Sequence, residues 1–269
     1  MSKIFFLGAG KMASALAGGA VKAGVLSAEL ICASDPDQRA ADSFVAATGA
    51  VCFTGDAVRH AAEADVTVLA VKPQMLEKAL ADFGKTLENK LVISIVAGVP
   101  IRRLRELSGA ARIIRVMPNT PALVGEGAAA YACEGTAEDD AIAAELLGAV
   151  GMVTRVDENL LDAVTGLSGS GPAYVFEFIR ALADGGVADG LSRDAALQLA
   201  AQTVLGAAKM VLESGEHPSV HKDKVTSPGG TTSRGLEHLA DRAFAGIVTQ
   251  AVRAATARSR ELGAGGCKK

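Results

Sequence analysis

The 269-residue chain has no tryptophan, 4% aromatic residues and four cysteines. The cysteines are Cys32, Cys52, Cys133 and Cys267. They form no C-x-x-C pair, so we expect reduced thiols in small core sites rather than a disulfide framework or a zinc site. Pro218 interrupts the helical spacing between His217 and His221, and a metal-binding pair is not expected there either. The sequence therefore predicts no metal site.

Net charge and long apolar runs are scarce as well. The chain carries 27 Lys and Arg against 30 Asp and Glu, a net charge of −3. Without a basic face or stacking aromatics, a nucleic-acid partner is not expected. The start MSKIFFLGAG has too short an apolar run for a secretory signal, and no apolar run looks long enough to span a bilayer. We expect a soluble cytoplasmic protein without membrane or nucleic-acid partners, ending in a frayed tail, GAGGCKK.

The first half alternates short apolar runs with helical patterns. The predicted strands are Lys3–Leu7, Leu30–Ser34, Val51–Phe53, Val66–Val71, Leu91–Val96 and Arg112–Met117, with two edge strands near Ala128–Cys133 and Met152–Val156. Helical patterns such as Met12–Ala23 and Met75–Phe83 lie between them. This alternation predicts an α/β fold, a Rossmann-type doubly wound parallel sheet covered on both faces.

The second half reads as helix throughout. Pro172 suits a first helical turn with Ser170 nearby as a cap, Ser192 caps a second helix that ends at Gly215, and a last helix is predicted for residues 241–262. Several of these helices are apolar on more than one face, which a small helical domain cannot cover alone. We therefore predict two domains, residues 1–162 with the parallel sheet and an all-α domain of residues 163–269 that mediates dimerisation.

A glycine-rich turn opens the chain, directly after a predicted strand and before a predicted helix. Gly8, Gly10 and Ala13 form G-x-G-x-x-A. The first glycine permits a tight turn, the second lets backbone approach a pyrophosphate, and the small third residue allows close helix packing. The helix N-terminus adds positive potential. This context predicts dinucleotide binding.

Asp35 lies 22 positions after Ala13, where a ribose-binding acid is expected. Its carboxylate would accept hydrogen bonds from the adenosine ribose and repel a 2′-phosphate, which favours NADH. Ser34 and Arg39 could instead serve a phosphate. The residues leave NADPH and NADH both open.

Other strand ends carry polar or small residues. Lys72 and Pro73 follow one strand, Ala97 and Gly98 another, and Asn119 lies in a proline-stiffened loop after the sixth. Ligands in such sheets bind beyond the carboxyl ends of the strands, so these residues are candidates. A solvated lysine and a turn-forming asparagine remain plain alternatives.

The stretch TSPGG interrupts the helical half at residues 226–230. Proline costs ~3 kcal/mol and each glycine ~1 kcal/mol in a helix interior. A rigid helix–helix connector would explain such a break, and so would a binding loop.

Six stretches occur together and in order. They are FLGAGKMASAL, AVKPQ, MPNTPALV, GLSGSGPAYVF, ADGGVADGL and DKVTSPGGTT. With them the chain resembles the 1-pyrroline-5-carboxylate reductase family from about Lys3 to Leu262. The resemblance implies an NADPH- or NADH-dependent enzyme that reduces the C=N bond of 1-pyrroline-5-carboxylate to L-proline, the last step of proline synthesis. It also implies a 6-phosphogluconate dehydrogenase-like two-domain plan and homodimers that often assemble into larger rings.

By the same resemblance, four segments contact the cofactor. They contain Leu7, Gly8, Ala9, Gly10, Lys11 and Met12; Ala70, Val71, Lys72 and Pro73; Ala97 and Gly98; and Asn119. NADPH-preferring members often carry a small polar residue or an arginine at the position of Asp35, a departure that leaves the nucleotide open while Ser34 could bind a phosphate. The substrate would lie at the dimer interface. It would be held by Ser227, Gly229, Gly230, Thr231 and Thr232, with Glu158 as a further substrate-side position.

The chemistry of a cyclic imino acid suits that loop. Gly229 to Thr232 can aim several backbone N–H groups at one point and bind a carboxylate without a cationic side chain. The Thr232 hydroxyl could hydrogen-bond the ring nitrogen, which makes Thr232 the predicted catalytic residue. No His/Asp pair, reactive cysteine or buried base stands out, so catalysis would rest on positioning.

Two alternatives stay open at the sequence level. A hydroxyacid dehydrogenase of the 6-phosphogluconate type shares the two-domain plan, but it needs a lysine base that SGSGPAYVFEFI lacks. A non-catalytic nucleotide-sensing protein would need the Rossmann half without the SPGGTT break.

Overall fold

The computed structural model describes residues 2–264, and Cys267 and the rest of the predicted tail after Ala264 lie outside them. Gly263 and Ala264, expected to fray, continue the last helix. The chain forms two compact units. One contains the residues up to Ser170 together with those from Arg253 onward, and the other is Gly171–Val252. These units are defined by compactness. The division after residue 162, between a cofactor-binding and a substrate-binding part, remains a prediction.

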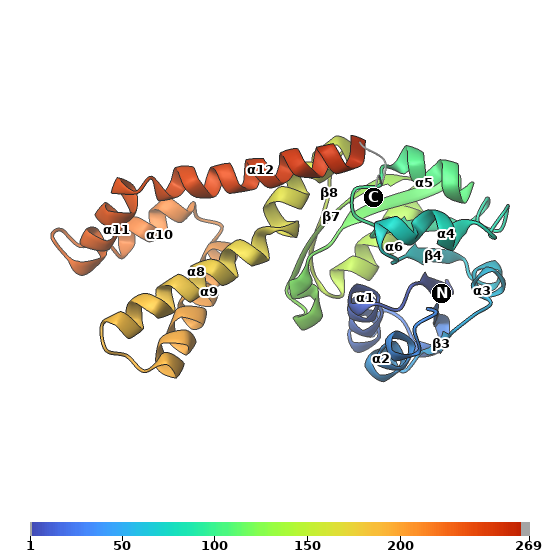
Figure 1. Ribbon diagram of the computed structural model, residues 1–269, viewed down its shortest axis with the longest axis horizontal. Helices are drawn as coiled ribbons and strands as arrows, with labels where there is room; N and C mark the ends of the chain where they lie inside the picture. The colour runs from blue at the N-terminus through green and yellow to red at the C-terminus, as the bar shows by residue number, and fades with distance from the viewer. Residues whose placement is uncertain (1, 265–269) are drawn as a thin grey trace. The chain divides into compact units, whose positions relative to one another are not determined.

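The first unit is built on a sheet whose strands match the predicted ones (Figure 1). The strands are β1 Ile4–Leu7, β2 Ile31–Ser34, β3 Val51–Phe53, β4 Val66–Leu69, β5 Leu91–Ser94, β6 Arg112–Met117, β7 Gly127–Glu134 and β8 Gly151–Arg155. Within the described residues their order is β3-β2-β1-β4-β5-β6-β7-β8. All neighbours are parallel except β6 and β7. The Rossmann-type sheet with two added edge strands is therefore confirmed.

Helices cover both faces of this sheet. They are α1 Lys11–Lys22, α2 Gln38–Thr48, α3 Ala57–Glu63, α4 Leu76–Leu80, α5 Ile101–Ser108, α6 Ala137–Gly148 and α7 Leu161–Val164. Phe5 and Phe6 point to opposite faces, as consecutive strand residues do. Phe6 packs in a core with residues of α1, α2 and α6, and Phe5 in one with residues of α3, α4, α5 and α7. The sheet is thus buried on both sides, as continuous apolar strands predict.

The second unit contains helices only. Its elements are α8 Gly171–Ala188, α9 Arg193–Ser214, α10 Pro218–Lys224, α11 Thr231–Asp241 and the start of α12 Phe244–Ala264. The Ser192 side chain caps α9 and Gly215 ends it with φ 66°, both as predicted. The predicted last helix is wrong at its start, because Asp241 closes α11 and Ala243, with φ 53°, separates it from α12.

The core of the second unit is small. Its buried members are Ala183, Ala196 and Ala200, where α8 and α9 lie side by side. Larger apolar side chains are exposed along the same helices, with Leu205 at 57% and Leu212 at 78%. Three alanines bury little apolar surface, so this unit leaves most of its apolar area uncovered.

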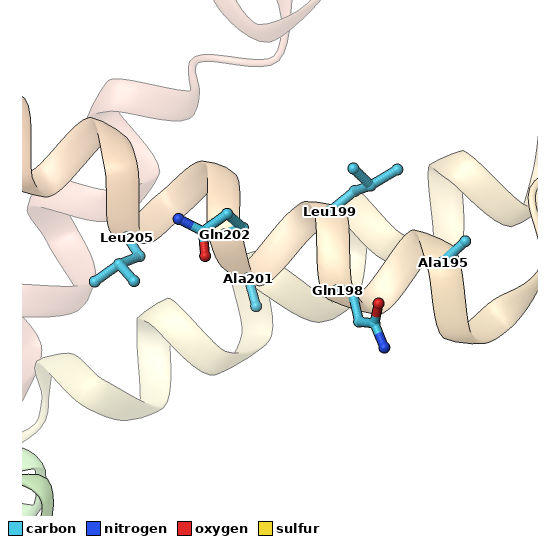
Figure 2. Close-up of a pocket in the computed structure, with 6 residues that line it drawn as sticks. All are labelled: Ala195, Gln198, Leu199, Ala201, Gln202 and Leu205. Carbon is cyan, nitrogen blue, oxygen red and sulfur yellow. The ribbon is translucent and has the colours of Figure 1, made fainter.

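Helix α9 corrects one expectation from the sequence. By length and composition it is apolar enough to cross a membrane, and 11% of its most apolar window is buried within the protein. One open flank carries Ala195, Gln198, Leu199, Ala201, Gln202 and Leu205 (Figure 2). Gln198 and Gln202 place two amide side chains on that flank, and hydrocarbon would leave such groups without hydrogen-bond partners.

Candidate active site

The carboxyl ends of β1, β4, β5 and β6 meet at one edge of the sheet. Backbone hydrogen bonds extend the parallel pairing past the strand ends, from Ala70 N to Leu7 O at 2.9 Å and from Ile95 N to Leu69 O at 3.1 Å. The strand order reverses direction between β1 and β4, the point where ligands bind in such sheets. The predicted cofactor residues on these strand ends are therefore brought together.

Gly8 can only be glycine in this turn. Its φ is 103°, and a Cβ there would lie 2.8 Å from the carbonyl oxygen of Ala70. Its N–H donates to Ser34 O at 2.8 Å, which ties the turn to β2. Gly10, by contrast, has open space where a Cβ would stand. Backbone can therefore approach a ligand closely at Gly10.

Helix α1 starts at this turn without a side-chain cap. Gly10 is the N-cap, no side chain bonds the first turn, and no acidic residue lies within it. The N–H groups of a first turn have no partner inside the helix. Lys11 and Met12 thus begin a helix whose free amides and dipole suit a pyrophosphate. The start of α1 therefore fits the dinucleotide pyrophosphate that the glycine pattern implies.

Asp35 lies at the end of β2 and contacts the same turn. Its Oδ2 accepts from Ala9 N at 2.9 Å, and its Oδ1 accepts from Asp37 N at 3.0 Å. Two backbone donors therefore fix the carboxylate next to the glycine-rich loop. Ser34, which is buried, donates its hydroxyl to Gly55 O at 3.3 Å.

The electrostatic effect of Asp35 is visible at Cys52 on β3. Burial, with the nearby Asp35 charge as second cause, raises the pKa of Cys52 from 9.0 to about 11. The described cysteines Cys32, Cys52 and Cys133 are all free and partly buried, and burial raises the pKa of each. Thiols of this kind are unreactive, so none is a candidate nucleophile.

The β5–α5 loop contains Ala97 and Gly98 and ends at Ile101. Its exit is held by Glu158, whose Oε1 accepts from Ile101 N at 2.7 Å and from Arg115 Nη1 at 3.0 Å. Glu158 was predicted on the substrate side. The structure places its carboxylate at the start of α5, in the first unit, while the SPGGTT loop lies in the second.

Asn119 is 8% exposed and uses both ends of its amide within the protein. Its Nδ2 donates to Ser168 O at 3.1 Å and its Oδ1 accepts from Ala128 N at 2.8 Å. Ser168 belongs to a π-helical turn, Thr165–Gly169. Such turns are rare and are frequently found at functional sites. Asn119 therefore fixes that turn against β7, and its contact with a cofactor stays a prediction.

The SPGGTT segment forms a tight loop before α11 in the second unit. Gly229 has φ 68°, and Gly230 N donates to Ser227 O at 3.1 Å. A Cβ on Gly230 would lie 2.3 Å from Ser227 Oγ. The loop therefore packs Gly230 closely against the Ser227 hydroxyl and brings the predicted substrate residues together at the start of α11, where Thr231 and Thr232 form the first turn.

Helix capping distinguishes α1 and α11 from α2, α6 and α9. Side chains of Asp37, Thr136 and Ser192 cap α2, α6 and α9. Gly10 and Gly230 are the N-caps of α1 and α11, and neither helix has a side-chain cap or an acidic residue in its first turn. Each unit thus has a glycine-led, uncapped N-terminus that can bind an anion, α1 in the first and α11 in the second.

The sequence patterns did not identify the residues that hold Glu158 and helix α12 in place. Arg115, Asp162 and Ser259 make buried or half-buried contacts across many positions of the chain. No short motif marks them, because each partner is distant in sequence.

Fold and site together define an oxidoreductase that uses a nicotinamide dinucleotide. A Rossmann-type half with a glycine-rich turn, exposed at Gly10, meets the requirements of that class. Two family models match the chain, "NADP oxidoreductase coenzyme F420-dependent" over residues 3–98 and "Pyrroline-5-carboxylate reductase dimerisation" over residues 158–262.

Relatives of known name agree along nearly the whole chain. A pyrroline-5-carboxylate reductase of Arabidopsis thaliana is 50% identical, over 97% of this chain and 95% of its own. One of Methanosarcina acetivorans is 48% identical, over 97% and 98%. The crystal structure of a Plasmodium falciparum pyrroline carboxylate reductase with NADP bound is 35% identical, over 97% and 98%, with a TM-score of 0.87. The chain belongs to the pyrroline-5-carboxylate reductase family.

Proposed function

We propose that the protein reduces the C=N bond of 1-pyrroline-5-carboxylate to give L-proline, using NADPH or NADH, as the last step of proline synthesis. One observation carries the substrate side of this proposal. The glycine-led N-terminus of α11 is left uncapped, although side chains cap α2, α6 and α9. The N–H groups of an uncapped helix start are free to bind an external acceptor, and a carboxylate is one.

The carboxylate of the imino acid binds at this N-terminus. The N–H groups of Thr231 and Thr232 converge with the helix dipole on one anion. Gly230 has no Cβ and so leaves room for the Ser227 hydroxyl beside the helix start. Gly229 supplies the positive φ that turns the chain into the helix. No cationic side chain is needed for this recognition.

The Thr232 hydroxyl orients the ring. It hydrogen-bonds the ring nitrogen, which carries a proton so that the adjacent carbon accepts a hydride. The C=N double bond becomes a single bond, with the hydride on carbon and the nitrogen retaining its proton as a secondary amine. Catalysis then comes from alignment of the two reactants rather than from a proton-transferring base.

The cofactor lies along the strand ends of the first unit. Gly8, Ala9, Gly10, Lys11 and Met12 form the turn for the pyrophosphate. The segments Leu7, Ala70–Pro73, Ala97–Gly98 and Asn119 line the rest, with Ser34 and Asp35 at the adenosine ribose. A reduced nicotinamide supplies the hydride when bound. Residues 1–162 form this cofactor half and 163–269 the dimerisation and substrate half.

The working form is a homodimer in the cytoplasm, and dimers assemble into larger rings. The exposed apolar faces of α8, α9 and α12 support this, because the second unit alone buries only alanines in its core. Covering faces of this kind is the usual role of a second copy.

One assay tests the function. Purified protein is mixed with 1-pyrroline-5-carboxylate and either NADPH or NADH, and both nucleotide consumption and L-proline are measured. Equal amounts of nucleotide consumed and proline formed support the proposal. Oxidation of a hydroxyacid without imine reduction favours the 6-phosphogluconate type, and tight nucleotide binding without turnover of either favours a sensor.

A further inference from the structure

The last turns of α12 belong to the same compact unit as the dinucleotide-binding sheet. Two polar residues of these turns are buried, Thr256 at 9% exposed and Ser259 at 6%. Ser259 Oγ donates to Asp162 Oδ1 at 2.6 Å, a short hydrogen bond to a carboxylate. Since the two residues are 97 positions apart, this bond ties the C-terminal helix to α7.

The end of α12 then reaches the β5–α5 loop. A Cβ on Gly263 would lie 3.4 Å from the carbonyl oxygen of Gly98, and one on Gly98 would lie 4.0 Å from Leu262 Cβ. The last turn of the helix therefore packs directly against the loop backbone. Gly98 is at φ 75°, so the loop has a conformation that few other residues adopt.

The short segment 158–162 holds both the exit of the β5–α5 loop and the end of α12. Glu158 holds the loop exit through Ile101 N, and Asp162, four positions later, holds Ser259. The loop is thus fixed at its exit by Glu158, which precedes α7, and covered by α12 at Gly98. Removing the Ser259 hydroxyl would free the helix end while leaving the Glu158 contact intact.

We propose that Ser259 is a positioning residue for the nicotinamide half of the cofactor. This rests on the proposed function, in which the dinucleotide lies across the strand ends. Asp35, the acid after β2, marks the position of the adenosine ribose, and the turn after β1 marks that of the pyrophosphate. The nicotinamide therefore extends in the other direction, toward β4 and β5. Ser259, acting through α12 and Gly98, holds the β5 side of that path. Its hydroxyl bonds Asp162 of α7, whereas Asp35 bonds the backbone at Ala9.

The test compares binding of the whole dinucleotide with binding of a fragment that lacks the nicotinamide. The difference reports on the nicotinamide half of the cofactor alone. Isothermal calorimetry compares NADH with ADP-ribose, and NADPH with 2′-phospho-ADP-ribose, on wild type and Ser259→Ala. We expect Ser259→Ala to weaken the dinucleotide about 3- to 10-fold, the effect of one lost hydrogen bond. Binding of the fragment should stay within about 2-fold.

Two further variants serve as controls for Ser259→Ala. Ser259→Thr keeps the hydroxyl and restores most of the dinucleotide affinity. Ser43→Ala is the matched control, because exposed Ser43 only donates to Arg39 O of its own helix, at 2.8 Å. It should change neither affinity. If Ser259→Ala does not fold, Asp162→Asn weakens the same bond and should show a smaller loss confined to the dinucleotide.

Equal loss for dinucleotide and fragment would overturn the proposal, since that indicates general damage to the sheet. Unchanged affinity for both in a folded Ser259→Ala would overturn it as well. The readout needs no turnover, so failure of imine reduction in wild type contradicts the proposed function without deciding this test.

Discussion

Asp35 Oδ2 accepts a hydrogen bond from the backbone N–H of Ala9, 2.9 Å away. The second carboxylate oxygen accepts from Asp37 N at 3.0 Å. A negative charge is therefore fixed at the glycine-rich turn, where the adenosine ribose is proposed to lie. A 2′-phosphate brought to this point would meet that charge at short range.

Replacing Asp35 by Asn or by Ser should shift coenzyme preference toward NADPH. Asn keeps an oxygen acceptor for Ala9 N and removes the charge. It therefore tests the repulsion of the 2′-phosphate without removing the hydrogen bond that orders the loop. Removal of one charge near a partly exposed phosphate is worth ~1 kcal/mol, which raises the NADPH-to-NADH ratio of kcat/KM about 5- to 10-fold. Steady-state rates with both nucleotides measure it. An unaltered ratio in Asp35→Asn means that the carboxylate does not face the ribose.

Thr232→Ala should lower kcat/KM for the imino acid about 10-fold or more, because one hydrogen bond to the ring nitrogen is lost. Thr232→Ser retains the hydroxyl and should keep most of the activity. Nucleotide affinity should not change in either variant, since Thr232 belongs to the other unit. Wild-type kcat/KM in Thr232→Ala would remove this hydroxyl from the mechanism.

Gly230→Ala should displace the Ser227 hydroxyl from the substrate loop. The added Cβ would lie 2.3 Å from Ser227 Oγ, so this side chain must rotate away. We expect kcat/KM for the imino acid to fall at least ~10-fold, as misplacement of a binding group by about 1 Å can do. Titration with NADPH and NADH should show unchanged affinity.

Gly235→Ala is the control for that variant. Gly235 lies within α11 and has open space where its Cβ would stand. Alanine is favoured there by about 1 kcal/mol, so the thermal midpoint should rise slightly while activity stays as in wild type. Equal loss of activity in both variants would show that the helix, rather than the loop, is sensitive.

Leu205→Asp should prevent dimer formation. Leu205 is 57% exposed on the open flank of α9, and an uncompensated charge in an apolar interface costs several kcal/mol. Size-exclusion chromatography with light scattering should show monomers for Leu205→Asp. Val45→Asp, at an exposed position of α2 in the first unit, should leave the wild-type mass. An unchanged mass for Leu205→Asp would place the interface elsewhere.

Local signals in the sequence account for most of the fold. Continuous apolar runs predict the strands because both faces of a parallel sheet are buried, and Ser192 and Gly215 mark the ends of α9 by their capping chemistry. The Ala243 break between α11 and α12 was missed, since alanine gives no warning of a positive φ.

The candidate site was predictable only where its residues are adjacent in the chain. The turn at Gly8 and Gly10 and the loop at Gly229 and Gly230 have local patterns. The bonds from Ile101 N to Glu158 and from Ser259 to Asp162 link positions 57 and 97 apart, and folding alone brings them together. Glu158 was singled out by resemblance, but its partners Arg115 and Ile101 were not foreseen.

A crystal structure of the protein with L-proline and oxidised nicotinamide nucleotide tests the central claim most directly. The account predicts that the proline carboxylate accepts hydrogen bonds of about 2.7–3.2 Å from the N–H groups of Thr231 and Thr232. The ring nitrogen should lie within the same range of Thr232 Oγ1. Proline bound away from the start of α11 would contradict the account.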